Sequence, residues 1–464
     1  MNFFETWRVP VRDRSPPRAA DNGQYMRAAR QIRKKISTVV LLTASFHRLA
    51  SAEGYLISLN CRWIRAVCFG IYLLVLVVPI TGWGESSQRT VLSAELPRLS
   101  GSATVSLLTY TPGVELYQAF GHSAIRIRDD ALEIDRLYNY GTFDFETPNF
   151  YLKFVHGDLL YQLNATSAEE EIQMVGAYGQ GVTELVLNLS QDQKQQLFEA
   201  LEYNLLPENR SYRYDFILDN CSTRPRDVLE RIIGVPIVEK SAGNLTFRRM
   251  LDPYFARMPW TGFGLSLLLG VNVDRNASPR EACFLPADLE RAVESTSDGQ
   301  QKLTSEKREI FPPGPLPRTP AWLSPPVVFT VGGLVWFFWW LLRRREAVNW
   351  LTAIVFTIFG ATGLFILGIS VWSRLAVLRL NYNLVWLIPT HLIAGIWLFL
   401  CKRRPLVVRW YLMFSAIAGF AFIGFSFLLP QEFHPAVYPL VAILAWRSIL
   451  GAVVGADLRV ARRE

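Results

Sequence analysis

Five long apolar segments in the last third of the sequence limit what this chain can fold into. They cover residues 322–342, 349–371, 384–400, 407–429 and 436–454. Each is about as long as a helix needs to cross the hydrocarbon core of a bilayer. The sequence therefore predicts an all-α transmembrane domain of five helices over residues 321–455.

Positive charge orients these segments. Basic clusters at 343–345, 402–404 and 459–463 end alternate segments, whereas Arg374 and Arg379 fall on the opposite side. Because basic clusters stay on the cytoplasmic side, the soluble domain within residues 84–320 is expected on the outer side of the membrane. This pattern also accounts for much of the net charge of +8, so we do not expect a nucleic-acid partner.

The N-terminal part has the features of a targeting segment. Residues 1–65 are rich in arginine and lack a periodic core, which predicts an unstructured basic leader or a start codon assigned too far upstream, with Met26 as a later start. Residues 66–84 resemble a signal peptide cleaved after Gly84, and an uncleaved membrane anchor is the alternative. No cysteine follows directly, so a lipoprotein signal is not expected.

The region between the leader and the membrane segments has the patterns of a mixed α+β domain, placed at 104–294. Ser190 and Gln193 form a capping box for a helix that reaches about Leu205, and Gly157 ends a short helix. Strands are predicted at 105–110, after Gly121, and at 132–140, 159–163 and 182–189. The polar, proline-rich residues 295–320 are predicted to be a linker.

Residues 210–232 hold the strongest chemical signal. Their first half alternates like a strand, and their second half has helical spacing from Cys221, with Asp219 and Asn220 at the N-cap position and Pro225 in the first turn. The helix dipole at such a junction, together with nearby Arg224, favours a thiolate. The pattern therefore predicts that Cys221 is a nucleophile.

A nucleophilic thiol needs a base, and His122 is the best candidate among the five histidines. A third residue usually orients the imidazole. Asn139 lies in the strand predicted to pair with that of His122, so we choose it, with Asp144 and His156 as alternatives. The backbone N–H of Cys221 is expected to face a tetrahedral oxyanion.

The cysteines allow one other interpretation. Cys221 and Cys283 belong to the domain outside the membrane, where a disulfide between them is possible. The apolar neighbours of Cys283 indicate instead a buried, unpaired thiol. No CxxC or HExxH spacing occurs, so neither a metal ion nor another cofactor is predicted.

Several motifs, taken in order, resemble known families. GHSAI at 121–125 followed by NCST at 220–223 resembles the permuted papain-like hydrolases of the NlpC type and the lecithin retinol acyltransferases. YNYGTFDF at 138–145, KFVHGD at 153–158 and DNCST at 219–223 are similar to the periplasmic domain of the Lnb lipoprotein N-acyltransferases. The resemblance covers roughly 104–289, and the later helices look like that family's membrane part. It implies a permuted papain-like α+β domain on the periplasmic side of the bacterial inner membrane.

Other residues are candidates for contacts with lipid. Arg224 could meet a phosphate headgroup or support the thiolate, and Tyr140, with Tyr138, Phe143 and Phe145, could line an acyl groove or belong to the core. Asn381, Asn383 and His434 fall at the outer ends of membrane segments, where polar groups are often functional. The alternative is that they satisfy backbone groups at helix ends.

Three functions fit these features. The first is an acyltransferase that moves a fatty acid from a phospholipid through a Cys221 thioester to an amine; by resemblance, the amine is the N-terminus of a lipoprotein. The second is a thiol peptidase or amidase acting on cell-wall peptide, with water as acceptor. The third is a membrane module that kept the fold without catalysis. The sequence leaves the acyl chain, the acceptor protein and the oligomeric state open.

Overall fold

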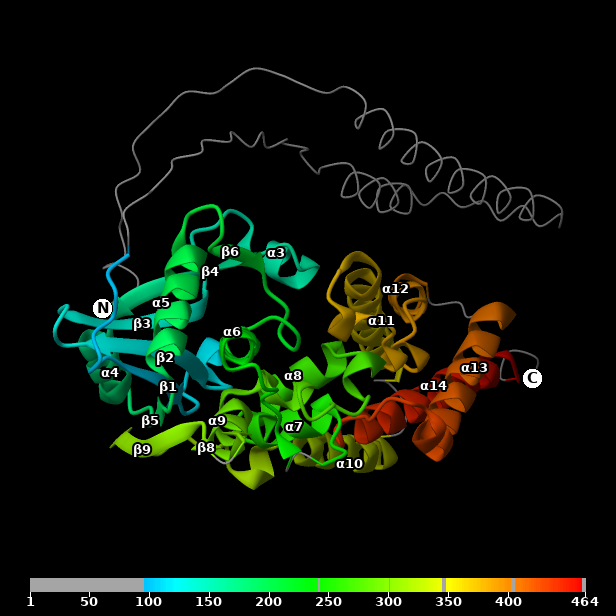
Figure 1. Ribbon diagram of the computed structural model, residues 1–464. Helices are drawn as coiled ribbons and strands as arrows, with labels where there is room; N and C mark the ends of the chain where they lie inside the picture. The colour runs from blue at the N-terminus through cyan, green and yellow to red at the C-terminus, as the bar shows by residue number, and fades with distance from the viewer. Residues whose placement is uncertain (1–95, 241–242, 300, 344–347, 402–404, 461–464) are drawn as a thin grey trace, which may run out of the picture. The chain divides into compact units, whose positions relative to one another are not determined.

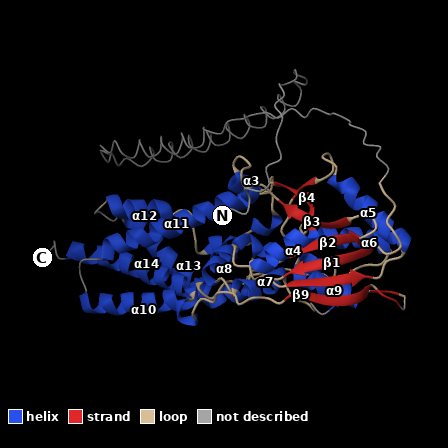
Figure 2. Cartoon of the chain, turned by 90° about the vertical axis from the view of Figure 1, so that its left-hand side faces the viewer, coloured by secondary structure: helices blue, strands red, loops and turns tan. Residues whose placement is uncertain are grey.

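A seven-stranded antiparallel sheet is the centre of the domain that precedes the membrane helices (Figures 1 and 2). The structure is a computed structural model, and it describes residues 96–240, 243–299, 301–343, 348–401 and 405–460. The strand order is β6-β4-β3-β2-β1-β5-β9. The first six strands are β1 (Thr104–Tyr110), β2 (His122–Asp129), β3 (Ile134–Thr142), β4 (Leu160–Ser167), β5 (Val182–Leu187) and β6 (Ser211–Arg213).

Helices cover both faces of this sheet. The larger core joins one face to α5 (Gln191–Leu205), α6 (Thr223–Ile233) and α9 (Pro286–Ser295), while α4 (Ala168–Ala177) covers the other face. The strand pattern explains this division because neighbouring side chains point to opposite faces. Leu107 belongs to the first core and Leu108 to the second. The mixed α+β class is confirmed.

Local signals in the sequence fix several element ends as predicted. The Ser190–Gln193 capping box starts α5, with both of its hydrogen bonds present. Gly157 ends α3 (Phe150–His156) with a φ of 86°, a left-handed conformation that favours glycine. The predicted hairpin of β2 and β3 also forms, with Ile125 opposite Tyr138.

The predicted linker at 295–320 is wrong over much of its length. Residues there form β7 (Ser297–Asp298), β8 (Gln301–Lys302) and β9 (Thr304–Phe311), and β9 pairs with β5 along one edge of the sheet. The pairing uses backbone groups, while the side chains from Ser305 to Glu309 are exposed. Charged edge strands protect a sheet from further pairing, and their composition resembles that of a linker.

Two other features differ from the sequence pattern. The strand expected from Tyr212 to Phe216 ends at Arg213, because the chain then turns through a bridge between Asp215 and Asp219. Helices α7 (Phe247–Phe255) and α8 (Pro259–Leu268) form a second core with the Cys221 loop. The sequence did not predict them, since α7 contains a proline and α8 is apolar on most of its surface.

The membrane part contains five main helices among the described residues: α10 (Pro325–Arg343), α11 (Val348–Trp372), α12 (His391–Leu400), α13 (Leu406–Phe425) and α14 (Val437–Val460). By length and composition, α10, α11 and α13 with the turn after it are long enough to cross a membrane. The third predicted segment is not one straight helix, because Ala376–Val385 and Thr390–Leu400 are bent by 48°. Pro389 lies at this break and cannot donate a helical hydrogen bond.

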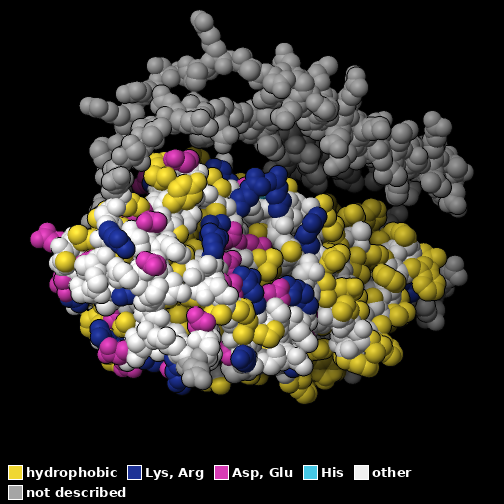
Figure 3. Space-filling view, in the orientation of Figure 1, with side chains coloured by type: hydrophobic (Ala, Val, Ile, Leu, Met, Phe, Trp, Pro, Cys, Tyr) yellow, Lys and Arg dark blue, Asp and Glu magenta, His cyan; other side chains and the backbone are white. Residues whose placement is uncertain are grey.

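The surface changes character between the two parts (Figure 3). Charged side chains are spread over the sheet domain, whereas hydrophobic side chains gather over the region of α11 to α14. Exposed residues there include Phe365, Ile417 and Phe420. A contiguous apolar surface of this size is expected of helices that face lipid. The predicted signal peptide or anchor lies outside the described residues.

We expect the loop after α11 to face the same outer compartment as the sheet domain. A cysteine at exposed Arg379, in a variant whose native cysteines are replaced by serine, should react with an impermeant maleimide in intact cells. Ser373 and Gln431, in neighbouring loops, are unsuitable because both are buried. Reaction of Arg345→Cys but not of Arg379→Cys would reverse the orientation.

Candidate active site

Cys221 lies directly before the first turn of α6. The helix starts at Thr223, and the Asn220 side-chain oxygen accepts hydrogen bonds from the backbone N–H groups of Ser222 at 2.8 Å and Thr223 at 3.0 Å. This Asn220 cap was predicted from the sequence. Asp219, the other predicted capping residue, pairs with Arg224 instead.

His122 is the first residue of β2 and lies opposite Tyr110 of β1. The preceding Gly121 has a φ of 81°, and a Cβ atom there would lie 2.4 Å from the Tyr110 carbonyl oxygen. Only glycine fits this close approach. The Gly-His sequence therefore fixes the position of His122 at the start of β2.

Asn139 of β3 holds the imidazole of His122. The His122 Nε2 atom lies 3.1 Å from Asn139 Oδ1. The two alternatives for this position lie elsewhere: Asp144 accepts a hydrogen bond from the Glu146 backbone, and His156 pairs with Asp158. The structure therefore brings together Cys221, His122 and Asn139, in the arrangement that a base and its orienting group require.

The charges of Cys221 and His122 stabilise each other. Burial by itself would raise the pKa of the Cys221 thiol, but the charge of His122 and hydrogen bonds from His122, the Ser123 backbone and the Ser222 side chain lower it. Burial would also lower the pKa of His122, yet the Cys221 charge and hydrogen bond, with Glu171 and Asn139, raise it. These directions favour a thiolate–imidazolium pair.

Glu171 of α4 extends this chain of contacts, and the sequence did not predict it. Its carboxylate accepts hydrogen bonds from Asn139 Nδ2 at 2.8 Å and Tyr110 Oη at 2.9 Å, and from the Thr166 hydroxyl. Ser167 followed by three glutamates does indicate a helix start. Nothing in that pattern shows that the third glutamate faces Asn139, which is 32 residues away.

Gly141 leaves room for the nucleophile. It has a φ of 95°, and a Cβ atom there would lie 3.4 Å from the Cys221 Cβ atom and 3.9 Å from its backbone nitrogen. The β3–β4 register shifts between Asn139 and Thr142, which places the strand end against the Cys221 loop. The positive φ favours glycine at this position, and a Cβ atom there would contact Cys221 directly.

The two predicted lipid-binding residues near Cys221 have protein partners. Arg224 makes a two-point ion pair with Asp219, at 2.5 and 2.8 Å, and lies 3.5 Å from the centre of the Tyr212 ring. Tyr140 is 2% exposed, belongs to the larger core and accepts a hydrogen bond from Asn204. Both also line a surface cavity of about 370 Å³ beside α6.

Asn381 and Asn383 join the membrane part to the sheet domain. Both are buried, and their amide groups donate to the carbonyl groups at the end of α8: Asn381 to Leu267 and Leu268, and Asn383 to Leu267. This is the role of satisfying helix-end carbonyls that the sequence left as the alternative. Their binding of a lipid headgroup stays a prediction.

His434 lies apart from Cys221 in the chain segment before α14. Its Nδ1 atom accepts a hydrogen bond from the Ala436 backbone, and its ring lies 5.2 Å from the ring of Phe263 in α8. It is partly buried. The structure therefore places His434 beside α8, the helix whose end is bound by Asn381 and Asn383.

The disulfide interpretation is wrong. Cys221 and Cys283 are both free, and Cys283 is buried with its sulfur 3.7 Å from the carbonyl oxygens of Ile237 and Pro279. Burial raises the pKa of Cys283 to about 12, so its thiol stays protonated and unreactive. Within the described ranges, no group of three or more His, Cys, Asp or Glu side chains could hold a metal ion.

Replacing Glu171 should change the pH range in which Cys221 reacts. Glu171→Gln removes a negative charge that raises the pKa of His122, so the imidazolium should lose its proton at lower pH. Iodoacetamide alkylation of Cys221 should then show the thiolate form over a narrower pH range, and the alkylation rate near neutral pH should be lower than in the wild-type protein. Glu170→Gln, on the exposed side of α4, is the matched control and should leave the profile unchanged. Equal profiles for both variants would contradict this role.

Removing the side-chain amides of Asn381 and Asn383 should weaken the attachment of the membrane part to the end of α8. Asn381→Ala leaves the Leu268 carbonyl without its donor, and Asn383→Ala leaves the buried indole N–H of Trp386 without its acceptor. Each loss costs about 1–3 kcal/mol of folding free energy. The melting temperature of the purified protein should therefore fall, whereas Asn188→Ala, at an exposed position, should change it little. An unchanged melting temperature in the Asn383→Ala variant would favour the ligand-binding role instead.

Comparison with known proteins agrees with this division of the chain. A family model described as the Lnb N-terminal periplasmic domain matches residues 99–252, and one described as the Lnb transmembrane domain matches residues 319–456. No curated protein and no solved structure matches the chain. The matched regions contain Cys221, His122 and Asn139, the helices α10 to α13 and most of α14.

The two matches occur in the order expected for one protein, a membrane protein with a periplasmic domain. Such domains imply a membrane enzyme that modifies lipoproteins. The chain therefore belongs to the Lnb-type lipoprotein N-acyltransferase family.

Proposed function

We propose that this protein is a cysteine-dependent acyltransferase that takes a fatty acid from a membrane phospholipid and passes it to the N-terminal amine of a lipoprotein. The observation that carries the proposal is the contact chain from Cys221 through His122 and Asn139 to Glu171. It supplies an activated nucleophile and a base whose orientation is fixed.

The first half-reaction forms a thioester. The Cys221 thiolate, whose proton rests on His122, attacks the ester carbonyl of the phospholipid. The Cys221 N–H has no protein acceptor among the described residues and is available to the oxyanion. When the tetrahedral intermediate collapses, the carbon–oxygen ester bond breaks and the His122 imidazolium protonates the lysophospholipid oxygen.

The second half-reaction transfers the acyl group. The free amine of the lipoprotein attacks the thioester carbonyl, and neutral His122 accepts a proton from the attacking nitrogen. The carbon–sulfur bond then breaks, which releases the amide product and returns the thiolate–imidazolium pair. Cys221 is deprotonated again without an added cofactor.

Contacts with the membrane helices favour lipid substrates over a soluble cell-wall peptide. The Ser373 hydroxyl donates to the Val155 carbonyl at the end of α3, and the Arg374 N–H donates to the His156 carbonyl. The ring of His156 lies 4.5 Å from that of Trp372, the last residue of α11. These contacts hold α3 where a membrane helix ends, which a peptidase would not need.

Aromatic rings connect α3 with the surroundings of Cys221. Phe143 lies 5.6 Å from Phe150 of α3 and 5.1 Å from Tyr161, measured between ring centres, and Tyr161 stacks on Tyr214 at 4.1 Å. Tyr161 and Tyr214 are both close enough to Cys221 that its negative charge contributes to raising their pKa. An acyl chain that leaves the bilayer beside α3 would meet this apolar surface.

The location follows from the same features. The sheet domain would lie on the periplasmic face of the bacterial inner membrane, where phospholipids and newly exported lipoproteins meet. The predicted signal or anchor segment at 66–84 would bring it there. The phospholipid donor and the lipoprotein acceptor would share one leaflet.

The acyl-enzyme can be trapped if the amine acceptor is left out. Purified protein given a phospholipid with a labelled fatty acid should hold label on Cys221 that neutral hydroxylamine releases. Cys221→Ala should hold none, and His122→Ala should load about a hundredfold more slowly, the usual scale for losing a general base.

Adding a lipoprotein with a free N-terminal amine should move the label to the lipoprotein. Label that appears only as free fatty acid, with or without the acceptor, would favour the hydrolase. Label that still appears on the Cys221→Ala variant would exclude both the acyltransferase and the hydrolase that use Cys221 as nucleophile. Cys283→Ala, at the buried free thiol, controls for labelling at a second cysteine.

A further inference from the structure

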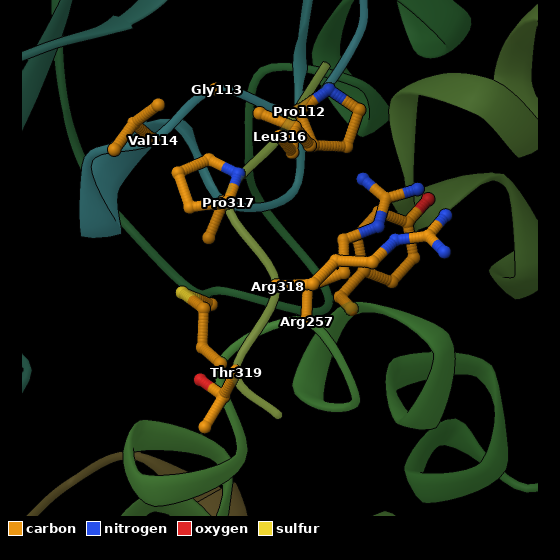
Figure 4. Close-up of a pocket in the computed structure, with 11 residues that line it drawn as sticks. Pro112, Gly113, Val114, Arg257, Leu316, Pro317, Arg318 and Thr319 are labelled. Carbon is orange, nitrogen blue, oxygen red and sulfur yellow. The ribbon is translucent and has the colours of Figure 1, made fainter. Parts of the chain in front are cut away.

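A pocket with two arginines lies at the level where the chain enters the membrane part. It is formed by the loop after β1, the end of α7 and the segment before α10, and its volume is about 250 Å³ (Figure 4). Val114, Met258 and Leu316 give it apolar walls. The side chains of Arg257 and Arg318 extend to the same side of the pocket.

These two arginines differ from several other arginines of this domain, which have counter-ions. Arg248, Arg249 and Arg280 each pair with a carboxylate. Within the part of the chain that the structure describes, neither Arg257 nor Arg318 has a carboxylate in ion-pair distance. Two such guanidinium groups on one pocket create a positive potential that attracts an anion. Their planar donor groups suit phosphate oxygens in particular.

The pocket lies next to the predicted membrane surface. Arg318 is followed by Trp322 and then by α10, which starts at Pro325. The indole N–H of Trp260 donates to the Leu323 carbonyl at 2.9 Å, and both tryptophans are exposed, Trp260 by 44% and Trp322 by 68%. Exposed tryptophans near a helix end are typical of the headgroup region of a bilayer.

The pocket is also close to the catalytic residues. Ala119 lines it and precedes His122 by three residues, a span of at most about 11 Å. The neighbouring Phe120 packs on Phe216, at 4.9 Å between ring centres, and the Phe216 carbonyl accepts a hydrogen bond from Asn220. Through these contacts, the segment that lines the pocket is connected to the loop that holds Cys221.

We propose that Arg257 and Arg318 bind the phosphate group of the phospholipid acyl donor. In a glycerophospholipid, a few bonds separate the phosphate from the ester carbonyls, so holding the phosphate at this pocket would bring an ester toward Cys221. This inference rests on the proposed function, since it names the donor subsite of the same reaction. The chemical class recognised is a phosphate diester at a membrane surface.

Binding is measured first, without catalysis. Full-length Cys221→Ala protein in detergent is titrated with a short-chain phosphatidylethanolamine and with diacylglycerol of the same chain length. Arg257→Gln and Arg318→Gln should each weaken phospholipid binding about tenfold and leave diacylglycerol binding unchanged. Arg98→Gln, also at an exposed position, should bind both lipids normally. Equal affinity of all variants for the phospholipid would overturn the proposal.

Thioester loading is measured second, in protein that has Cys221. The double variant should need a higher phospholipid concentration for half-maximal loading while reaching a similar maximal rate, and lysine at both positions should restore part of the affinity. A loss of equal size on diacylglycerol would show a structural role and overturn the phosphate site. If wild-type protein binds phospholipid through these arginines but never forms a thioester, the proposed function fails and the binding site remains.

Discussion

The hydrogen bonds of the Asn220 side-chain amide are the interaction on which the geometry around Cys221 depends. It is buried, donates to the carbonyls of Phe216 and Phe284, and accepts from the N–H groups of Ser222 and Thr223. An amide has two donor hydrogens and an oxygen with two lone pairs, so every position is used. The group ties the turn before Cys221, the start of α6 and the second core to one another.

The other side chains of the candidate site form a chain of contacts that leads away from Cys221. β2 provides His122, β3 provides Asn139 and α4 provides Glu171, so two strands of the sheet and one helix packed on it supply side chains that are linked to the thiol through His122. Because the strands pair in register, the imidazole and the amide that orients it keep their separation. The glycines at 121 and 141 matter for the same reason, since both have a positive φ, and at Gly121 a Cβ atom would also clash with the Tyr110 carbonyl oxygen.

The sequence predicted the parts of this arrangement that depend on local patterns. The capping box at Ser190, the strand that begins at His122 and the presence of a helix shortly after Cys221 all come from residues near one another in the chain. Glu171 and the pairing of β9 depend on contacts between distant segments, which local patterns do not contain. Asn381 and Asn383 show a different limit, because a polar residue at a membrane helix end can serve a ligand or a backbone carbonyl, and only the neighbouring α8 distinguishes these.

The pairing of β9 with β5 has a mechanical consequence. If residues 295–320 had been an unstructured linker, the sheet domain could have changed its position and its distance from the membrane part. Instead the sheet edge holds the chain up to Phe311, and only a short proline-rich stretch remains before α10. The contacts of α8 and α3 with the membrane part restrain the domain at two further points. The sheet domain is thus attached to the membrane part at three places, and the proposed lipid substrates would have to reach Cys221 in a domain that is held in one position.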